Sequence, residues 1–133
     1  MADEAVVLHL DSDIQYFTVA DGTAIAKGSI LVIGSDPRTA VAHTAGDEVF
    51  LGVTVEDKVA SDGQTRLAAR CRGIFDMKAK ANTTLGDYVM LSTTANQVTP
   101  VEAGALSGQR LRNLVGICLE TASAAEVVQI WVR

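Results

Sequence analysis

Cysteine, histidine and aromatic residues are scarce in this chain of 133 residues. The two cysteines, Cys71 and Cys118, stand 47 residues apart without a CxxC pair, and the chain has two histidines. A zinc site needs about four such ligands, so we expect no metal and interpret both cysteines as small apolar strand residues. Aromatic residues make up 5% of the chain, which leaves little material for the exposed aromatic platform of a sugar-binding domain.

Long apolar runs and an excess of positive charge are also missing. The longest apolar run, residues 30–33, is far shorter than the roughly 20 residues that cross a bilayer. The N-terminal segment MADEAVVLHL lacks the basic start of a signal peptide, so we expect the protein to stay in the cell that makes it. The net charge is −5, and phosphate binding needs a basic patch. We therefore expect neither a membrane nor a nucleic acid as a direct partner.

The sequence contains no P-loop, dinucleotide-binding, nucleophile-elbow or HExxH motif. Glu56 and Glu120 follow apolar segments just before turns, and we interpret them as solvated strand ends rather than a catalytic pair. Lys78 lies in a setting like that of the modified lysine of carrier domains, but its flanks lack the Met-Lys-Met or Thr-Asp-Lys-Ala cores of those domains. We interpret Lys78 as a surface residue and expect no enzymatic activity and no cofactor.

Apolar and polar residues alternate over five to ten positions, between clusters of Gly, Asp, Asn and Ser. This pattern is typical of short strands and turns. It predicts an all-β domain, a compact sandwich or small barrel with little or no helix. The predicted strands lie near residues 5–10, 14–20, 30–34, 39–43, 49–56, 65–75, 87–91, 97–101, 112–120 and 126–132.

The alternation is clearest in the predicted strand at 65–75. Its first face is expected to be buried and consists of Leu67, Ala69, Cys71, Gly73 and Phe75. Its second face is expected to be exposed and consists of Arg66, Ala68, Arg70 and Arg72. The row of arginines predicts either a solvated face or a contact with another protein subunit, because the planar guanidinium group pairs well with carboxylates.

The chain also contains an internal repeat. Residues 17–32 align with residues 75–90 at a spacing of 58, and residues 50–60 align with residues 114–124 at a spacing of 64. The matched positions include Phe17 and Phe75, Gly28 and Gly86, Gly52 and Gly116, and Glu56 and Glu120. The two repeat halves cover about 14–75 and 75–133. A half of this size buries little surface alone, so we expect one β domain over 14–133 whose halves interlock around one core.

The last strand can be aligned with the first half in two ways. A spacing of 60 sets Leu67 over Val127, whereas a spacing of 61 sets it over Val128. A shift of one residue exchanges the two faces of a strand, and only the second alignment buries three apolar residues and no amide. The preferred spacing of 61 places Trp131 on the outer face. An exposed tryptophan is uncommon in a monomer, so Trp131 is a candidate contact residue.

The order of these segments, from AIAKGSILVIG through LGDYVMLSTTANQVTPVE to LVGICLETASAAEVVQIWV, resembles the capsid decoration, or cement, proteins of tailed viruses. This bacteriophage family has a duplicated, β-tulip-like fold. The resemblance covers residues 14–133 and depends on patterns of glycine and apolar residues. It implies a structural virion protein, made in the host cytoplasm, that binds the capsid exterior as a homotrimer. There it would bridge and stabilise subunits of the major capsid protein.

The segment 1–13 departs from the common core of this family. We expect it to be an N-terminal arm or first strand that adds to an edge of a capsid protein. The contact candidates are therefore Asp3, Glu4, Val6 and Leu8 in this arm, together with Trp131, Arg66, Arg70 and Arg72. The alternative is another non-catalytic β binding module, such as a carbohydrate-binding or head-fibre domain.

Overall fold

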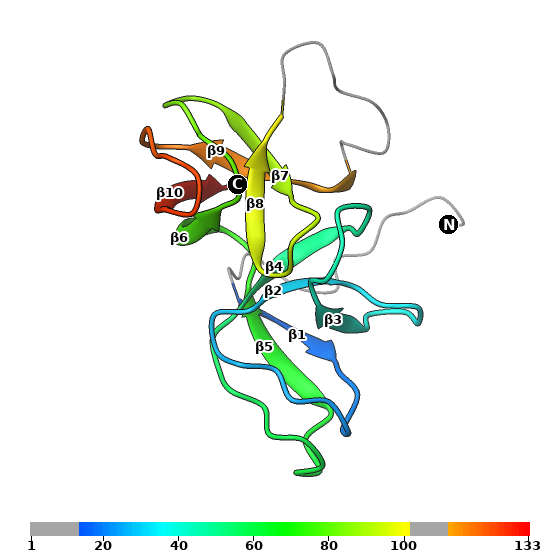
Figure 1. The fold of residues 1–133 in the computed structure, drawn as a ribbon. Helices are drawn as coiled ribbons and strands as arrows, with labels where there is room; N and C mark the ends of the chain where they lie inside the picture. The colour runs from blue at the N-terminus through cyan, green and yellow to red at the C-terminus, as the bar shows by residue number, and fades with distance from the viewer. Residues whose placement is uncertain (1–13, 102–111) are drawn as a thin grey trace, which may run out of the picture.

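The computed structural model describes residues 14–101 and 112–133, which form ten β-strands in two lobes (Figure 1). The first lobe consists of β1 (Ile14–Thr18), β2 (Ile30–Ile33), β3 (Ala40–Ala42), β4 (Phe50–Thr54) and β5 (Arg66–Arg70). The second lobe consists of β6 (Gly73–Ala79), β7 (Tyr88–Leu91), β8 (Gln97–Pro100), β9 (Leu114–Cys118) and β10 (Val127–Val132). The predicted all-β fold is confirmed.

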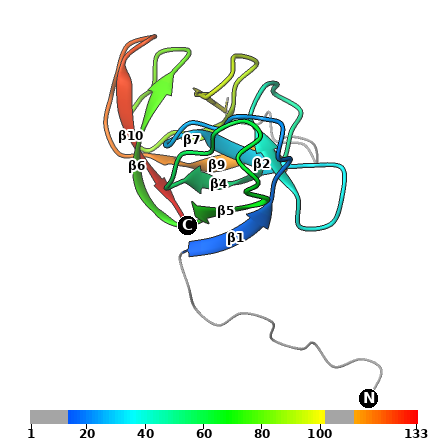
Figure 2. The same ribbon diagram turned by 90° about the horizontal axis from the view of Figure 1, so that it is seen from below.

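The two lobes have the same strand order. The first lobe is a five-stranded sheet in the order β1-β5-β4-β2-β3, and Figure 2 shows β1, β5, β4 and β2 side by side. The second lobe is a closed barrel in which β6 pairs with β10 and, in parallel, with β8. At the corresponding seam the first lobe has a single parallel bridge, between Thr18 and Thr39. The first lobe is therefore a slightly opened version of the second.

Backbone hydrogen bonds recur at the spacings of 58 and 64. The N–H of Gly28 donates to the carbonyl of Thr54 over 3.0 Å, and the N–H of Gly86 donates to the carbonyl of Cys118 over 2.9 Å. Gly28 and Gly86 have φ angles of 84° and 91°, a region that glycine adopts without a steric penalty. The internal repeat is thus present in the backbone as well as in the sequence.

The alignment of the last strand at a spacing of 61 is also confirmed. The Glu56 carboxylate accepts the N–H of Ala68 over 3.0 Å, and the Glu120 carboxylate accepts the N–H of Gln129 over 3.0 Å. The inward side chains of β10 are fully buried at Val128 and Ile130. The loop before β10 is three residues shorter than the loop before β5, which explains the change of spacing from 64 to 61.

The predicted strand at 65–75 is two strands that belong to different lobes. Strand β5 ends at Arg70 and β6 starts at Gly73, whose φ of 135° turns the chain from one lobe into the other. Ala68, expected on the exposed face, is buried. It pairs with Tyr16 on β1, and its small methyl group lies beside that large ring. Alternation alone did not distinguish a continuous strand from two strands joined by a short link.

The interior contains two clusters of buried apolar residues, so the expectation of one interlocked core is wrong. The smaller cluster lies in the first lobe and includes Leu31 and Leu67. The larger cluster fills the second barrel and also takes in Ile30 and Val32, from the outer face of β2. Each lobe therefore has its own core, and the lobes are joined because the outer face of β2 packs against the second barrel.

Hydrogen bonds fix this junction between the lobes. The side-chain oxygen of Asn96 accepts the N–H of Ile30 over 2.8 Å. The N–H of Asn96 donates to Nδ1 of His43 over 3.0 Å, and Nε2 of the same ring lies 2.9 Å from the carbonyl oxygen of Ser92. Since Nδ1 accepts, Nε2 carries the proton and donates to Ser92. His43 is therefore a buried structural residue.

Candidate functional site

The outer face of the second barrel carries a row of apolar side chains that crosses four strands. Ile74 on β6 is paired with Trp131 on β10, Trp131 with Ile117 on β9, and Ile117 with Tyr88 on β7. Directly paired residues on one face of a sheet have neighbouring side chains. Ile74, Trp131 and Tyr88 are 63%, 41% and 46% exposed, and Ile117 is half-buried. We call these four residues the apolar row.

Trp131 lies on the outer face of β10, as the alignment at a spacing of 61 predicts. The guanidinium carbon of Arg133 lies 4.9 Å from the centre of the indole ring, a cation–π distance. Tryptophan beside arginine is a combination that often dominates the binding energy of protein interfaces. Sequence reasoning missed Arg133, although its position two residues after Trp131 on the same face of a strand was the available signal.

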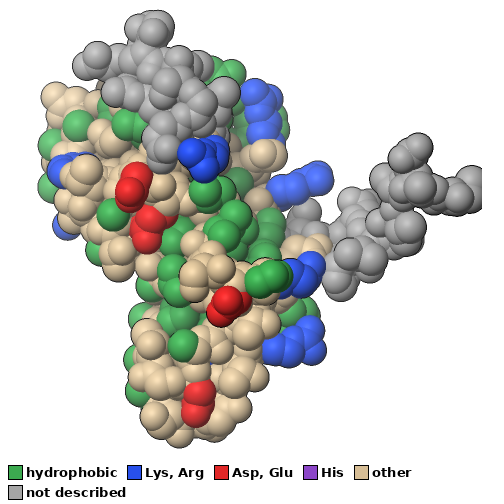
Figure 3. Space-filling model, turned by 90° about the vertical axis from the view of Figure 1, so that its right-hand side faces the viewer, with side chains coloured by type: hydrophobic (Ala, Val, Ile, Leu, Met, Phe, Trp, Pro, Cys, Tyr) green, Lys and Arg blue, Asp and Glu red, His purple; other side chains and the backbone are tan. Residues whose placement is uncertain are grey.

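The predicted arginine row does not form a continuous patch with Trp131 along one strand. Arg66 is exposed on β5 in the first lobe, and its guanidinium carbon lies 5.0 Å from the centre of the Tyr16 ring. Arg70 is half-buried at the end of β5, and Arg72 is exposed in the link between the lobes. In Figure 3 most lysine and arginine side chains in view lie toward one edge of the molecule, apart from the acidic side chains. The three arginines remain contact candidates.

A second pairing of a cation with an aromatic ring on β1 was not foreseen. The guanidinium of Arg38 lies 6.0 Å from the centre of the Phe17 ring and donates a hydrogen bond to the carbonyl of Tyr16 over 3.0 Å. The consecutive aromatic residues Tyr16 and Phe17 were the sequence signal. The four remaining contact candidates in the arm, Asp3, Glu4, Val6 and Leu8, lie outside the described residues and stay predictions.

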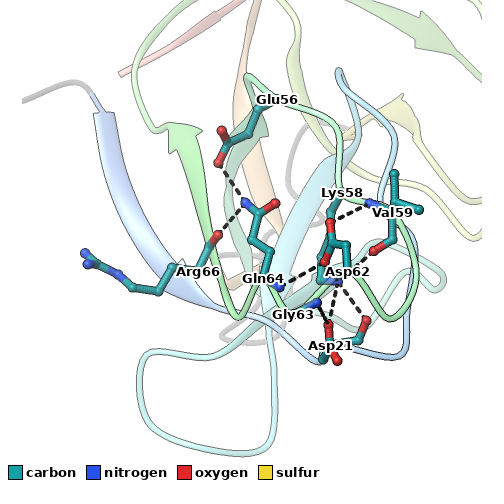
Figure 4. Close-up of polar contacts among 8 residues, drawn as sticks. All are labelled: Asp21, Glu56, Lys58, Val59, Asp62, Gly63, Gln64 and Arg66. Carbon is teal, nitrogen blue, oxygen red and sulfur yellow. Dashed lines mark hydrogen bonds and ion pairs between the residues drawn. The ribbon is translucent and has the colours of Figure 1, made fainter.

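A buried lysine organises the loops at the far end of the first lobe (Figure 4). The Lys58 amine donates to the carbonyls of Asp21 and Val59 over 2.7 and 3.0 Å and to the carboxylate of Asp62 over 3.1 Å. The backbone N–H of Gln64 is the largest cause that lowers the pKa of Asp62, and the Lys58 amine adds to it. Three acceptors satisfy the three protons of the ammonium group. This lysine is therefore a structural tie.

The two repeat-related glutamates lie just after strands β4 and β9, Glu56 half-buried and Glu120 exposed, and each also has a structural role. Each carboxylate fastens the last strand of its lobe through a backbone N–H. Glu56 also accepts a hydrogen bond from the Gln64 amide over 3.3 Å (Figure 4). Lys78 is exposed and lies within β6, where it pairs with Val127 and Gln97. A carrier lysine needs the tip of an exposed hairpin, and Lys78 does not lie at one.

The described residues offer little for chemistry. Over residues 14–101 and 112–133, no group of three or more His, Cys, Asp or Glu side chains is arranged to hold a metal ion. The same residues include no helix that is long and apolar enough to cross a membrane. A mainly apolar groove of about 750 Å³ lies between the lobes, and its lining includes Gly46, Lys80, Met90, Thr99 and Asn113. Its lining also includes Thr93, whose hydroxyl accepts a hydrogen bond from the exposed Lys80 amine.

Comparisons with known proteins relate the chain to proteins of bacteriophage heads. The N base of the head fibre gp8.5 of bacteriophage phi29 has a similar fold, with a TM-score of 0.60 and 15% sequence identity over 90% of this chain and 94% of that chain. No curated protein matches the sequence. The model of the phage cement protein family matches residues 9–133, nearly the whole chain. The chain therefore belongs to the phage cement protein family and is a structural, capsid-associated protein of a bacteriophage.

Proposed function

We propose that this protein decorates the exterior of a phage capsid as a homotrimer and stabilises it by bridging subunits of the major capsid protein, without catalysing a reaction. The observation that supports this role best is the apolar row, an exposed set of large side chains on a closed barrel. An exposed patch of this kind, rimmed by polar residues, is typical of an interaction surface. Membership of the cement family supports the capsid as the place where this surface works.

The architecture of the two lobes suits a protein that bridges capsid subunits. A closed barrel has no free edge, so the second lobe withstands unwanted strand pairing with its neighbours. The first lobe retains edge strands β1 and β3, joined by one bridge, and residues 1–13 precede β1 in the sequence. In our proposal this arm, with Asp3, Glu4, Val6 and Leu8, extends from the barrel and pairs with an edge of the major capsid protein. The net charge of −5 favours a protein partner over the packaged nucleic acid.

The experiment that tests this function mixes the purified protein with undecorated heads. We expect saturable binding, with added density on the outside of the shell by electron microscopy, and decorated heads that withstand higher temperature than bare ones. A variant lacking residues 1–13 tests the arm, and it is expected to bind more weakly. Heads that stay bare at saturating protein would exclude the proposed function.

A head-fibre base is the second candidate. The likeness of the fold to the N base of the phi29 head fibre supports it, since the match spans 90% of this chain. A fibre base would anchor a projecting element and would not need to stabilise the shell. The same microscopy separates the two roles: decoration that leaves the heat resistance of the heads unchanged favours a fibre base, whereas increased resistance favours a cement protein.

A further inference from the structure

The face that carries the apolar row is exposed on the second lobe but covered on the first. The repeat matches Tyr88 with Ile30, and Ile117 with Val53. Ile30 and Val53 are paired with each other in the first lobe, as Tyr88 and Ile117 are in the second. Ile30 is 2% exposed because the second lobe packs on it, whereas Tyr88 is 46% exposed. The same surface therefore has an occupant in one lobe and lacks one from the described residues in the other.

The occupant in the first lobe is the turn between β7 and β8, residues 92–96. Asn96 accepts the N–H of Ile30, and the carbonyl of Ser92 receives the proton of His43. The methyl group of Thr93 would lie 3.3 Å from a Cβ placed on Gly46, so the start of the turn also contacts the first lobe. The turn shares this junction with β6, whose Asp76, Met77 and Lys78 lie beside Ile30 and Val53.

The first lobe has the same turn, at residues 34–38. The N–H of Gly34 donates to the carbonyl of Thr39 over 2.7 Å, and the N–H of Ser92 donates to the carbonyl of Gln97 over 3.1 Å. Arg38 and Asn96 end the two turns with φ angles of 56° and 60°. Ser35, Asp36, Pro37 and Arg38 are exposed. Each chain therefore has one turn that is hydrogen-bonded to the other lobe and one turn of the same shape, at 34–38, whose hydrogen bonds stay within its own lobe.

We propose that the apolar row is the docking site for a second copy of this chain, and that the turn at 34–38 of that copy occupies it. The side chains at the two sites differ in a complementary way. Where the seated turn has Asn96 against Ile30, the exposed turn has Arg38 and the exposed face has Tyr88 with Trp131 nearby. A guanidinium group over an aromatic ring is favourable, and Arg38, which lies over the Phe17 ring of its own chain, would exchange that ring for Tyr88 of the second copy.

This contact is heterologous, because a turn on one copy meets a different surface on the next. Each copy then has one free turn and one free face, so contacts of this kind generate a closed ring or an open filament. The inference rests on the proposed homotrimer, and it makes the trimer a ring in which the contact within each chain is repeated between chains. Three copies would place six lobes around one axis in a continuous sequence of turn-to-face contacts.

Two variants test the direction of the contact. Tyr88→Lys/Trp131→Lys removes the face and leaves the turn intact. Ser35→Arg puts a long side chain into the turn, at the position that corresponds to Thr93, and leaves the face intact. All three positions are exposed, so both variants are expected to fold, which far-UV circular dichroism and thermal melting check. Val59→Lys, at a 66% exposed position in the Lys58 loop, is the matched control.

Native mass spectrometry measures the assemblies. We expect wild type and Val59→Lys to form trimers and each of the two test variants to be monomeric. An equal mixture of the two test variants is expected to form dimers with one chain of each kind and no trimers, because only one turn and one face are intact per pair. Wild-type protein that stays monomeric, test variants that still form trimers, or a mixture that stays monomeric would each overturn the inference.

Binding to undecorated heads is measured in parallel and separates this inference from the proposed function. If the face variant forms trimers but no longer binds heads, the row contacts the capsid and the inference fails while the function stands. If the wild type forms the predicted ring but does not bind heads, the function fails while the contact between copies stands.

Discussion

The two lobes are built from one repeated unit, yet they differ in how completely they close and in how their end loops are held. The second lobe is a closed barrel, and its loop before β10 is three residues shorter than its counterpart. The first lobe is less completely closed, and the buried Lys58 ties its longer end loops together. At the position that matches Lys58 the second lobe has Ala122, which is also buried. The shorter loop is held by backbone N–H groups that donate to Glu126 and Asn82, whereas the longer loop is also tied by the buried amine of Lys58.

The largest effect is expected at the glycines of β4 and β9, which occupy matched positions. A Cβ on Gly116 would overlap the carbonyl oxygen of Trp131, and a Cβ on Gly52 would lie 2.7 Å from the carbonyl oxygen of Arg70. Both contacts involve backbone, which cannot move aside easily. We expect Gly116→Ala to lower the free energy of unfolding by about 3 kcal/mol and Gly52→Ala by less.

Urea denaturation of both variants measures this difference between the lobes. Gly22→Ala is the control, because the space around Gly22 is open and its φ is not in the left-handed region. Equal destabilisation by Gly52→Ala and Gly116→Ala would mean that the slightly opened first lobe and the closed second lobe tolerate an added methyl group equally. That result would contradict the prediction.

Replacement of Lys58 is expected to give the next largest loss of stability. Lys58→Met keeps the volume but removes hydrogen bonds to two carbonyls in a buried site, and we expect a loss of about 2 kcal/mol. The carboxylates of Asp21 and Asp62 are partly exposed, so solvent screens their share. Thermal melting against Lys27→Met, an exposed lysine of the same lobe, measures the effect. A variant as stable as wild type would show that the loops close without the tie.

The Lys58 tie also predicts a dependence on pH. The pKa of Asp62 in the folded state lies below its ordinary value of 3.8, with the Gln64 N–H as the largest cause. A lowered pKa stabilises the folded state above the unfolded pKa, and this contribution disappears as the pH falls through the folded pKa. The difference in stability between wild type and Asp62→Asn is therefore expected at neutral pH and should shrink below about pH 4. A difference that grows in acid would contradict this assignment.

Replacement of Glu56 and Glu120 by alanine is expected to cause a smaller loss of stability, and one that is more similar in the two lobes. Glu56→Ala and Glu120→Ala each delete a hydrogen bond to a backbone N–H of the last strand, for which we expect a loss of about 1 kcal/mol. The loss at Glu56 should be the larger of the two, since Gln64 also donates to it. Chemical denaturation with Asp36→Ala as an exposed acidic control measures both values. A larger loss of stability for Glu120→Ala than for Glu56→Ala would contradict this prediction.

The smallest effect on stability is expected at Trp131, together with a large effect on assembly. Trp131 is exposed on the outer face, so Trp131→Ala should change the free energy of unfolding by about 0.5 kcal/mol or less. At an interface the same truncation removes about 2 kcal/mol, which weakens the trimer roughly 30-fold. Light scattering over a dilution series measures the trimer, with Val59→Ala as the control. An unchanged trimer would exclude Trp131 from the interface.

Much of the fold was predictable because the repeat shows the same pattern of glycine and apolar residues twice. Gly28 and Gly86 marked the same turn twice, and the apolar alternation of 127–132 gave the faces of β10 correctly. The passage between the lobes was not predictable in the same way. Cys71 and Arg72 continue the alternation of β5 into β6, and only the φ of Gly73 shows that the strand ends there. One-dimensional periodicity does not record which sheet a strand joins.

The candidate site was predictable in part, for a related reason. The alignment at a spacing of 61 placed Trp131 outside, but the apolar row also needs Ile74, Ile117 and Tyr88, which come from three other strands. Their proximity depends on pairing register across the barrel, and single-strand patterns do not contain it. The buried role of Lys58 was missed because its acceptors are mainly backbone carbonyls, which every residue carries.

The two-residue link between β5 and β6 has a consequence for how strong the contact between the lobes must be. Because Cys71 and Arg72 tether the lobes, each meets the other at the high effective concentration of a short linker, in the millimolar range. Even a contact that would be weak between separate molecules is then formed nearly all the time. A regular shell supplies the same advantage between copies, since it holds neighbouring binding positions at fixed separations. In the proposed layer on the capsid, this would add to the affinity with which the copies already associate in solution.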